Sequence, residues 1–511
     1  MYTVSFAFMY SFPVPDFLPL ILLPPLFLLI HYTLHQAAIS SIPGPWLISS
    51  LSPGPVRRLL TDPRTFTDCM DHLGRTYGDT FAVWLGFSRV VVTSVPADIV
   101  HITSSPALFP RPEKIRNVFK LASPGGLFTM PAEKHRIVRR RLRDSFNHKM
   151  LHSFHQAMIN AVRQLCKELE SAAASGKPVD ISKPFAMATF MVITNVAFGS
   201  DMPLEERVAF ADVVNCFTEE MMYEYMGSPF RKAFAWFGTR KRFYKTRNRV
   251  YELCNKFIER RKQETTKEKE ERKTDMLDAI IALEDQSAEA MTSIVVEFAL
   301  TGSHSINQML SWCIYEICGA QKAADSIEKE LKERVGDRPL GEYLAMEDVE
   351  SLQYIKSVWK ETCRLHPSGS STSRVAAKNV TLKGSGVHVS KGTEIHGQVR
   401  RSQRKAPIWK RGEQFVPERW ISGPEGPGVE RVPAGAFNPF SLGQMNCAGR
   451  FLANYEGPLL LAEIFRRFRV RLACDRKAVQ NRTLFIDTPK FVSSEGRETG
   501  IPVLVDLRYS H

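Results

Sequence analysis

The sequence is poor in the features that mark secreted, nucleic-acid-binding or metal-cluster proteins. Its nine cysteines are scattered from Cys69 to Cys474 without the short spacing of a disulfide framework, which favours reduced thiols in the cytosol. No zinc-finger or RNA-binding signature occurs, although the formal net charge is +14. We therefore expect a generally cationic surface and no nucleic-acid partner.

The middle of the chain lacks helix breakers. No proline occurs between Pro229 and Pro339, and glycine is rare there. Apolar residues recur at three- and four-residue spacing, as at Phe298 and Leu310, which predicts several long helices. The charge-rich segment 262–273 is interpreted as an exposed stretch between or along these helices, and we assign it no function.

Extended, alternating segments are confined to the two ends of the globular part. Residues 80–92 and 380–395 predict small sheets. With 44% apolar and 24% charged residues, the composition is that of a folded protein with a large core. The sequence thus predicts one mainly α domain with small β-sheets over residues 57–511.

The N-terminus lacks charge. Asp16 is the only charged residue before Arg57, and residues 17–34 are almost entirely apolar. This length matches the roughly 20 residues that a membrane-spanning helix needs, although prolines within it disfavour a regular helix. We predict a membrane anchor at residues 1–36 and a proline-rich hinge at residues 37–56.

A cleaved signal peptide is the competing interpretation of this N-terminus. It fits less well, because no basic region precedes the apolar run and no small-residue cleavage site follows it. The basic residues begin after the run, at Arg57 and Arg58, so the globular body is expected on the cytosolic side.

A glycine-flanked cysteine stands near the C-terminus. Residues 437–450 read FNPFSLGQMNCAGR, with Gly443 and Gly449 on either side of Cys447. Glycine permits positive φ and close approach of the backbone to a flat cofactor. An apolar-periodic helix is predicted directly after the loop, and its N-terminus would stabilise a thiolate at Cys447.

Three motifs in order resemble the cytochrome P450 superfamily. The pattern Phe440-x-x-Gly443-x-x-x-Cys447-x-Gly449 resembles the haem loop of that family. Upstream, KETCRLHP at residues 360–367 resembles its E-x-x-R helix, and PERW at residues 417–420 resembles its P-E-R-F/W segment. The resemblance covers nearly the whole chain, from residue 43 to the C-terminus.

The resemblance implies a haem b cofactor that lies between a long central helix and the cysteine loop, with Cys447 as the axial ligand of its iron. Glu361 and Arg364 share one helix face at i, i+3, and Arg419 is expected to complete a buried carboxylate–guanidinium cluster with them. A surface salt bridge is the alternative for either pair taken alone.

The residues that hold the haem propionates are expected to be unusual. The family generally has arginine or histidine two residues before the cysteine, whereas this chain has Met445. By position, the resemblance points instead to His135 and Arg139, at i and i+4, and to Arg374 after the E-x-x-R helix.

The expected oxygen-activating stretch also departs from the family. TGSHSI at residues 301–306 matches the family's A/G-G-x-D/E-T-T/S pattern, with His304 in place of the acid and Ser305 in place of the first threonine. A helical glycine costs about 1 kcal/mol relative to alanine, so Gly302 is expected to have a packing or functional reason. Ser305 keeps a hydroxyl and His304 can relay protons, although local bonding of His304 with a water chain in its place is an equal alternative.

The resemblance implies a monooxygenase that uses dioxygen and electrons from a separate NADPH–cytochrome P450 reductase, because the chain has no dinucleotide or flavin motif of its own. Arg450 is a candidate contact for that acidic partner. The expected location is the endoplasmic reticulum membrane with the catalytic domain in the cytosol. Two alternatives stay open: a haem-thiolate isomerase, dehydratase or peroxide-using enzyme, and a haem-binding protein without turnover.

The expected substrate is a lipophilic small molecule. Segments that match the family's substrate-contact regions contain the following apolar residues: Phe119, Leu127, Phe128, Phe217, Met221, Met222 and Phe230. They predict an apolar pocket. The hinge and anchor resemble fungal microsomal members of specialised metabolism, which often oxidise terpenoids; this assignment is by analogy.

Overall fold

The protein was analysed as a computed structural model. It describes residues 42–45, 62–85, 88–143, 148–198, 205, 239–271, 275–283, 286–406, 408–421, 432–484 and 486–508. The predicted anchor at 1–36 and nearly all of the predicted hinge lie outside these ranges. Among the described residues, no helix is long and apolar enough to cross a membrane.

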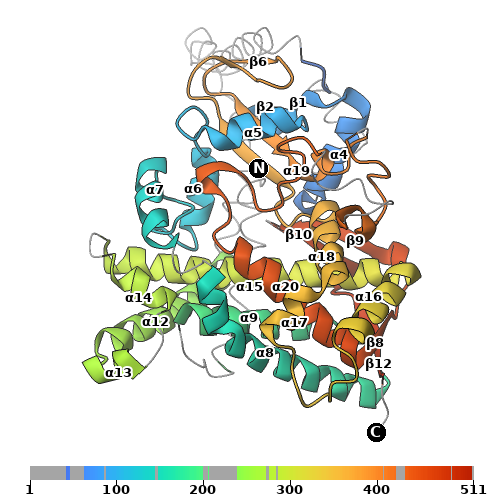
Figure 1. The fold of residues 1–511 in the computed structure, drawn as a ribbon. Coiled ribbons are helices and arrows are strands. Elements are labelled where there is room, and N and C mark those ends of the chain that lie inside the picture. The colour runs from blue at the N-terminus through green and yellow to red at the C-terminus, as the bar shows by residue number, and fades with distance from the viewer. Residues whose placement is uncertain are drawn as a thin grey trace, which may run out of the picture.

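Helices dominate the described chain (Figure 1). The α-helices are α4 (Phe66–Tyr77), α5 (Pro96–Ser104), α6 (Glu113–Lys120), α7 (Ala132–Arg141), α8 (His148–Ser175), α9 (Ser182–Phe198), α12 (Thr239–Lys262), α13 (Thr266–Glu271), α14 (Met276–Ile281), α15 (Ala288–Cys318), α16 (Gln321–Arg334), α17 (Met346–Ser351), α18 (Gln353–Leu365), α19 (Val399–Ser402) and α20 (Arg450–Arg467). Short 3₁₀ turns are η1 (Pro63–Thr65), η3 (Pro417–Trp420), η5 (Gly443–Met445) and η6 (Arg476–Ala478).

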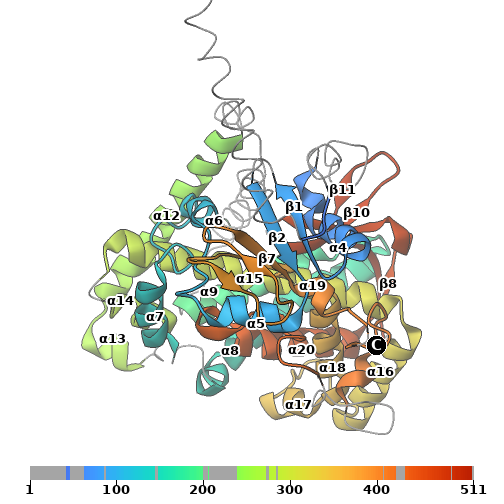
Figure 2. The same cartoon turned by 90° about the horizontal axis from the view of Figure 1, so that it is seen from above.

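The strands form small sheets at the margins of the helical body. They are β1 (Thr80–Leu85), β2 (Ser88–Thr93), β3 (Val179–Asp180), β4 (Ser371–Val375), β5 (Val380–Thr381), β6 (His388–Val389), β7 (Glu394–Gln398), β8 (Phe468–Leu472), β9 (Val479–Leu484), β10 (Ile486–Val492), β11 (Glu498–Thr499) and β12 (Pro502–Leu507). The largest sheet has the order β1-β2-β7-β4, in which β2 and β7 run parallel and the other pairs are antiparallel. Figure 2 shows this sheet beside α4 and α5.

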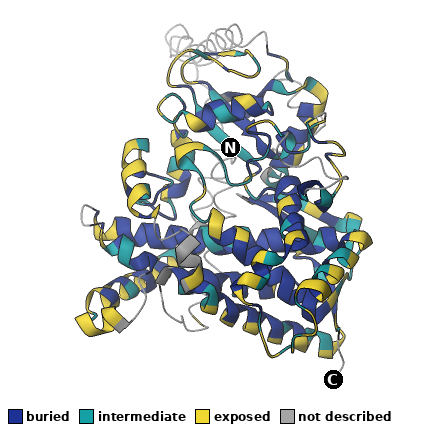
Figure 3. Cartoon of the chain, viewed as in Figure 1, coloured by how far each residue is buried: buried dark blue, intermediate teal, exposed yellow. Residues whose placement is uncertain are grey.

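The long helix α15 crosses the middle of the molecule and organises the core (Figure 1). It begins at Ser287, whose side chain accepts a hydrogen bond from the Ala290 N–H, and its 31 residues contain no proline. It packs against α9, α12, α18 and α20. Most of its side chains are buried, whereas α13 is almost entirely exposed (Figure 3).

The predicted fold class, mainly helical with small sheets, is confirmed by the described elements. Residues 80–92 form the hairpin of β1 and β2, and the charge-rich segment contains the exposed helix α13. The segment 380–395 is less regular than predicted, because only the short pair β5–β6 and the start of β7 fall within it.

Candidate functional site

Most of the predicted site residues line a single cavity, whereas Gly443 and the predicted cluster of Glu361, Arg364 and Arg419 lie outside its lining. Its volume is about 420 Å³, and its walls come from α15, the segment after α18, helices α6 and α7 with the loop between them, and the cysteine loop. The lining includes the following predicted residues: His135, Arg139, Gly302, His304, Ser305, Arg374, Phe440, Met445, Cys447 and Gly449. Residues more than 300 positions apart in the sequence are therefore brought together.

Cys447 faces this cavity from the position that the motif predicts. Among the cysteines in the described ranges, Cys447 alone is exposed, while its loop is held by a hydrogen bond from its own N–H to the Phe440 carbonyl (2.8 Å). Although Cys447 is open to the cavity, desolvation by the surrounding walls raises the pKa of its thiol, whereas the Gly449 N–H, Arg139 and Arg450 lower it. Helix α20 begins at Arg450, so the sulfur lies at a helix N-terminus that favours the thiolate.

The two glycines of the loop differ in backbone conformation and in their surroundings. Gly443 adopts φ +73°, and a Cβ there would lie 2.6 Å from the Thr103 carbonyl oxygen of α5, so glycine is required. The expectation of positive φ at Gly449 is wrong: it is the N-cap of α20 with φ −83°. A Cβ at Gly449 would meet nothing within 4 Å, so the protein itself does not require glycine there; close approach of the backbone to a flat cofactor on the cavity side stays the expected reason.

The carboxylate–guanidinium cluster is buried next to this loop. Glu361 and Arg364 are fully buried, and Arg364 donates to both carboxylate oxygens (2.9 and 2.8 Å). Glu361 also accepts from the Arg419 Nε (3.0 Å), the Trp420 Nε1 (2.8 Å) and the Val416 N–H (2.9 Å). A carboxylate with this many charge-assisted and neutral donors is fully satisfied.

Two contacts that the sequence did not reveal join this cluster to the cysteine loop. The Trp420 ring lies 4.5 Å from the ring of Phe437, centroid to centroid. The Gln403 amide donates to the Cys363 and Arg364 carbonyls (3.1 and 3.0 Å), and its oxygen accepts the Asn438 N–H (2.8 Å). The end of α18 is therefore tied to the start of the loop.

Basic side chains gather at one side of the cavity. His135, Arg139, Arg374 and Arg111 all line it, and the last was not predicted from the sequence. Burial lowers the pKa of all four, to about 4 for His135 and about 10 for Arg374, and mutual repulsion adds to the shift at His135 and Arg374. The arginines disfavour one another's charge, so an anion beside them would stabilise all three, whereas His135 is neutral near pH 7.

This environment fits a haem with its two propionates. The Nδ1 of His135 is buried with no hydrogen-bond partner among the described residues. Within the described ranges, Arg374 donates only to the Thr372 hydroxyl and the Ser373 carbonyl of its own strand. Both the thiol and the open space at Gly449 lie on the same cavity. Met445 also lines it and contributes apolar contact but no charge.

The central helix presents its predicted residues to the cavity in different ways. A Cβ on Gly302 would lie 2.6 Å from the Cγ1 of Ile193 in α9, so close packing of α9 and α15 requires this glycine. The Ser305 hydroxyl donates to the Thr301 carbonyl (2.7 Å), a back-bond that bends helices.

His304 lines the cavity from α15. Its Nε2 is buried without a partner among the described residues, and burial with nearby Lys490 lowers its pKa to about 4. The imidazole is thus neutral near pH 7, so it offers one donor and one acceptor and does not store a proton as a cation.

Three of the seven predicted apolar pocket residues line the cavity. Phe119, Leu127 and Phe128 line the cavity, and the rings of Phe119 and Phe128 stack at 4.5 Å. The other predicted contacts lie outside the described residues: Phe217, Met221, Met222 and Phe230. Glu297 is a lining residue that was missed, although a single acid within the apolar run IVVEFAL was a visible signal.

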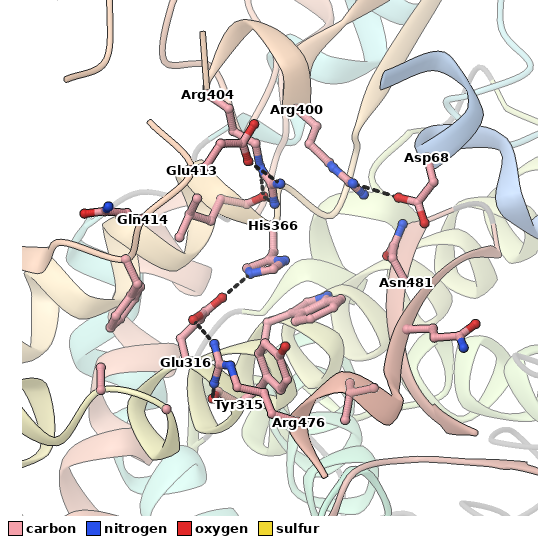
Figure 4. A pocket seen from close by; sticks show the side chains of 17 residues that line it. Asp68, Tyr315, Glu316, His366, Arg400, Arg404, Glu413, Gln414, Arg476 and Asn481 are labelled. Carbon is pink, nitrogen blue, oxygen red and sulfur yellow. Dashed lines mark hydrogen bonds and ion pairs between the residues drawn. The ribbon is translucent and has the colours of Figure 1, made fainter. Parts of the chain in front are cut away.

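A second pocket, of about 690 Å³, lies at the C-terminal end of α15 (Figure 4). Glu316 accepts from the Nε2 of His366 (2.7 Å) and is also paired with Arg476, and Arg400 contacts Asp68 (2.7 Å). Burial lowers the pKa of His366 to about 4, so it donates as a neutral ring. Because these charged groups pair with one another, they hold neighbouring segments together at this end of α15. This pocket is therefore a weaker candidate for the reactive site than the cavity at Cys447.

Comparison with known proteins gives a consistent result. The family model described as Cytochrome P450 matches residues 56–492. Cytochrome P450 71B6 from Arabidopsis thaliana is 24% identical over 90% of this chain and 92% of its own length. Amorpha-4,11-diene 12-monooxygenase from Artemisia annua is 23% identical over 86% and 88%, and indoleacetaldoxime dehydratase from Arabidopsis thaliana is 24% identical over 63% and 65%.

Proposed function

Because the chain belongs to the cytochrome P450 family, we propose that it is a haem-thiolate monooxygenase that inserts one oxygen atom of dioxygen into a lipophilic small molecule. The observation that carries this proposal is the shared cavity, which is lined by an accessible cysteine, three arginines with His135, and the hydroxyl-bearing stretch of α15. The finer assignment of the substrate as a terpenoid or related secondary metabolite rests on analogy.

In this proposal Cys447 ligates the haem iron, and His135, Arg139, Arg374 and Arg111 surround the propionates. When bound, the haem supplies the activation of dioxygen, and thiolate ligation favours cleavage of the O–O bond. The chain supplies the surroundings: the Gly449 N–H offsets charge on the sulfur, and apolar side chains exclude water.

Proton delivery is assigned to the hydroxyl and imidazole on α15. The Ser305 hydroxyl, which faces the cavity, passes a proton from its oxygen and takes one up again. The neutral His304 ring accepts at one nitrogen and donates at the other, so it exchanges protons without remaining charged. A neutral relay replaces the acid that is typical of the family.

Electrons are proposed to come from a separate NADPH–cytochrome P450 reductase. Lys134, Arg136 and Arg140 of α7 are exposed, and so are Arg450 and Phe451 beside the cysteine loop. A basic surface near the thiolate suits an acidic partner. We further propose that residues 1–36 anchor the protein in the endoplasmic reticulum membrane, with the catalytic domain in the cytosol.

The test is the absorption spectrum of the reduced, CO-treated protein. We expect the red-shifted Soret band of thiolate-ligated haem in the wild type and its loss in Cys447→Ala. Cys363→Ala is the matched control, because Cys363 is a buried cysteine on α18 next to the same cavity. A Cys447→Ala protein that keeps the band contradicts the ligand assignment.

The altered relay favours one second candidate, an isomerase, dehydratase or peroxide-using haem-thiolate enzyme that needs no proton delivery to dioxygen. Product analysis with reductase and NADPH, and in their absence, separates the two. Product that forms without NADPH or dioxygen supports the second candidate, whereas haem binding without any product supports a protein that has no turnover.

A further inference from the structure

One wall of the cavity is formed by the segment that follows α18. Residues 367–369 and 371–374 line the cavity, whereas Ser370 lies outside the lining and is 4% exposed. The Ser370 hydroxyl instead donates to Oδ1 of Asp487 in β10 (3.1 Å), and Asp487 also lies outside the lining. The wall therefore has a polar attachment to a residue behind it.

Asp487 joins several elements through its carboxyl group. It is 1% exposed, and its Oδ1 also accepts the hydroxyls of Thr67 in α4 (2.9 Å) and Thr483 in β9 (3.1 Å). Its Oδ2 pairs with the Arg400 Nη1 (3.3 Å), and Arg400 of α19 pairs in turn with Asp68 of α4 (Figure 4). A buried polar group with partners on both oxygens is held in one position.

Backbone contacts strengthen the attachment and extend it to α15. The Asp487 N–H donates to the Ser368 carbonyl (3.0 Å), and the Arg400 N–H donates to the Ser370 carbonyl (3.1 Å). The Ser368 hydroxyl donates to the carbonyl of Ser305 in α15 (3.4 Å). Ser368 thus links Asp487 to the helical turn that carries the proposed proton relay.

Resting on the function proposed above, we infer that Asp487 is a positioning residue that holds residues 367–372 at a set distance from α15 and so determines how tightly a substrate is held over the haem. It acts through Ser368 and Ser370 and does not itself touch the substrate. A wall that is fixed before binding needs no ordering when a ligand arrives, which raises the affinity for ligands that fill the cavity.

The experiment uses the full-length, haem-loaded protein and two probes, imidazole and 4-phenylimidazole. Both ligate a haem iron through nitrogen and shift its Soret band, so their dissociation constants are measured by optical titration. The phenyl ring has to fit between α15 and residues 367–372, whereas imidazole alone occupies little of the cavity. The ratio of the two dissociation constants therefore reports on the wall.

Ser370→Ala removes the hydroxyl that attaches the wall to Asp487 and leaves the cavity lining unchanged. We expect 4-phenylimidazole to bind about threefold or more weakly relative to imidazole in this variant. Thr483→Val is the matched control, because it removes another hydroxyl from the same oxygen of Asp487 but lies in β9, outside the lining. It should keep the wild-type ratio to within about twofold.

Asp487→Ala tests the positioning residue directly. It should weaken the relative binding of 4-phenylimidazole by about threefold or more, as Ser370→Ala does. In the Asp487→Ala background, Ser370→Ala should add less than about twofold, because the hydroxyl has already lost its partner on the carboxyl group. Independent, additive effects of the two substitutions would contradict the proposed connection.

A wild-type ratio in Ser370→Ala, or a gain in relative affinity for 4-phenylimidazole, would overturn the inference, since the wall is then held without this hydroxyl. An equal change in Thr483→Val would overturn it too, as a general loss of stability. If Asp487→Ala does not take up haem, the two hydroxyl variants decide. Failure of the proposed function looks different: the wild type then shows no thiolate-type CO band, or no oxygenated product with reductase and NADPH, whatever the ratio.

Discussion

Replacement of Glu361 by glutamine should destabilise the protein more than any comparable surface change. Glu361 accepts five hydrogen bonds, two of them from Arg364, and it is fully buried. In Glu361→Gln, one acceptor oxygen becomes an amide donor that faces the donors of Arg364 and Trp420. Two buried guanidinium groups, of Arg364 and Arg419, then lack a counter-charge.

Breaking a buried ion pair by removing one partner costs about 3–5 kcal/mol. That is a large share of the roughly 5–15 kcal/mol that stabilises a folded protein. We expect a lower urea midpoint by circular dichroism and less haem per protein after purification. Haem content should fall because Trp420, which donates to Glu361, also contacts Phe437 at the start of the cysteine loop.

Asp506→Asn is the control. Asp506 pairs with Arg471 (2.7 Å), and the two side chains are 52% and 64% exposed, so screening by solvent limits the loss to about 1 kcal/mol or less. The reasoning is refuted if Glu361→Gln shifts the urea transition no more than Asp506→Asn and retains wild-type haem content.

Three further outcomes are expected. Gly302→Ala should destabilise the protein by about 1–3 kcal/mol, and so lower its melting temperature, because its Cβ meets Ile193; Ile193→Ala should therefore cost less stability in that background than in the wild type. His366 has a folded pKa of about 4 against an ordinary 6.5, so the unfolded state binds more protons between these values; wild-type melting temperature should fall as pH decreases from 6.5 to 4, and more steeply than in His366→Asn. Ser305→Ala should raise the hydrogen peroxide formed per NADPH consumed, and unchanged coupling removes this hydroxyl from the proton relay.

The site residues that could be predicted from the sequence are those that belong to short motifs with fixed spacing. Cys447 with its glycines occupies one loop, and Glu361 with Arg364 occupies one helical turn, so short patterns identify them. Even there a positive φ was wrong for Gly449, which has φ −83°, because a glycine in a motif does not reveal which of its properties is used. Local pattern identifies the residue more reliably than its conformation.

The residues that were missed act through contacts between distant segments. Arg111 becomes a cavity residue because its loop folds back onto α15, and Gln403 bridges α18 to the cysteine loop through an ordinary amide. The charge of His304 depends on burial, which spacing does not encode. Glu297 was visible as a single acid in an apolar run, but the hydrogen bond that it accepts from the Phe128 N–H is a property of the packed loop.

The continuity of α15 constrains how this chain can change over evolutionary time. One unbroken helix of 31 residues carries Glu297 at the loop, Gly302 against α9, His304 at the cavity and Glu316 at the second pocket. Each residue turns the helix by about 100°, so insertion or deletion of a single residue would rotate every later position away from its partner. Substitutions along α15 can therefore diversify one position at a time, whereas a change in its length would disrupt several sites at once.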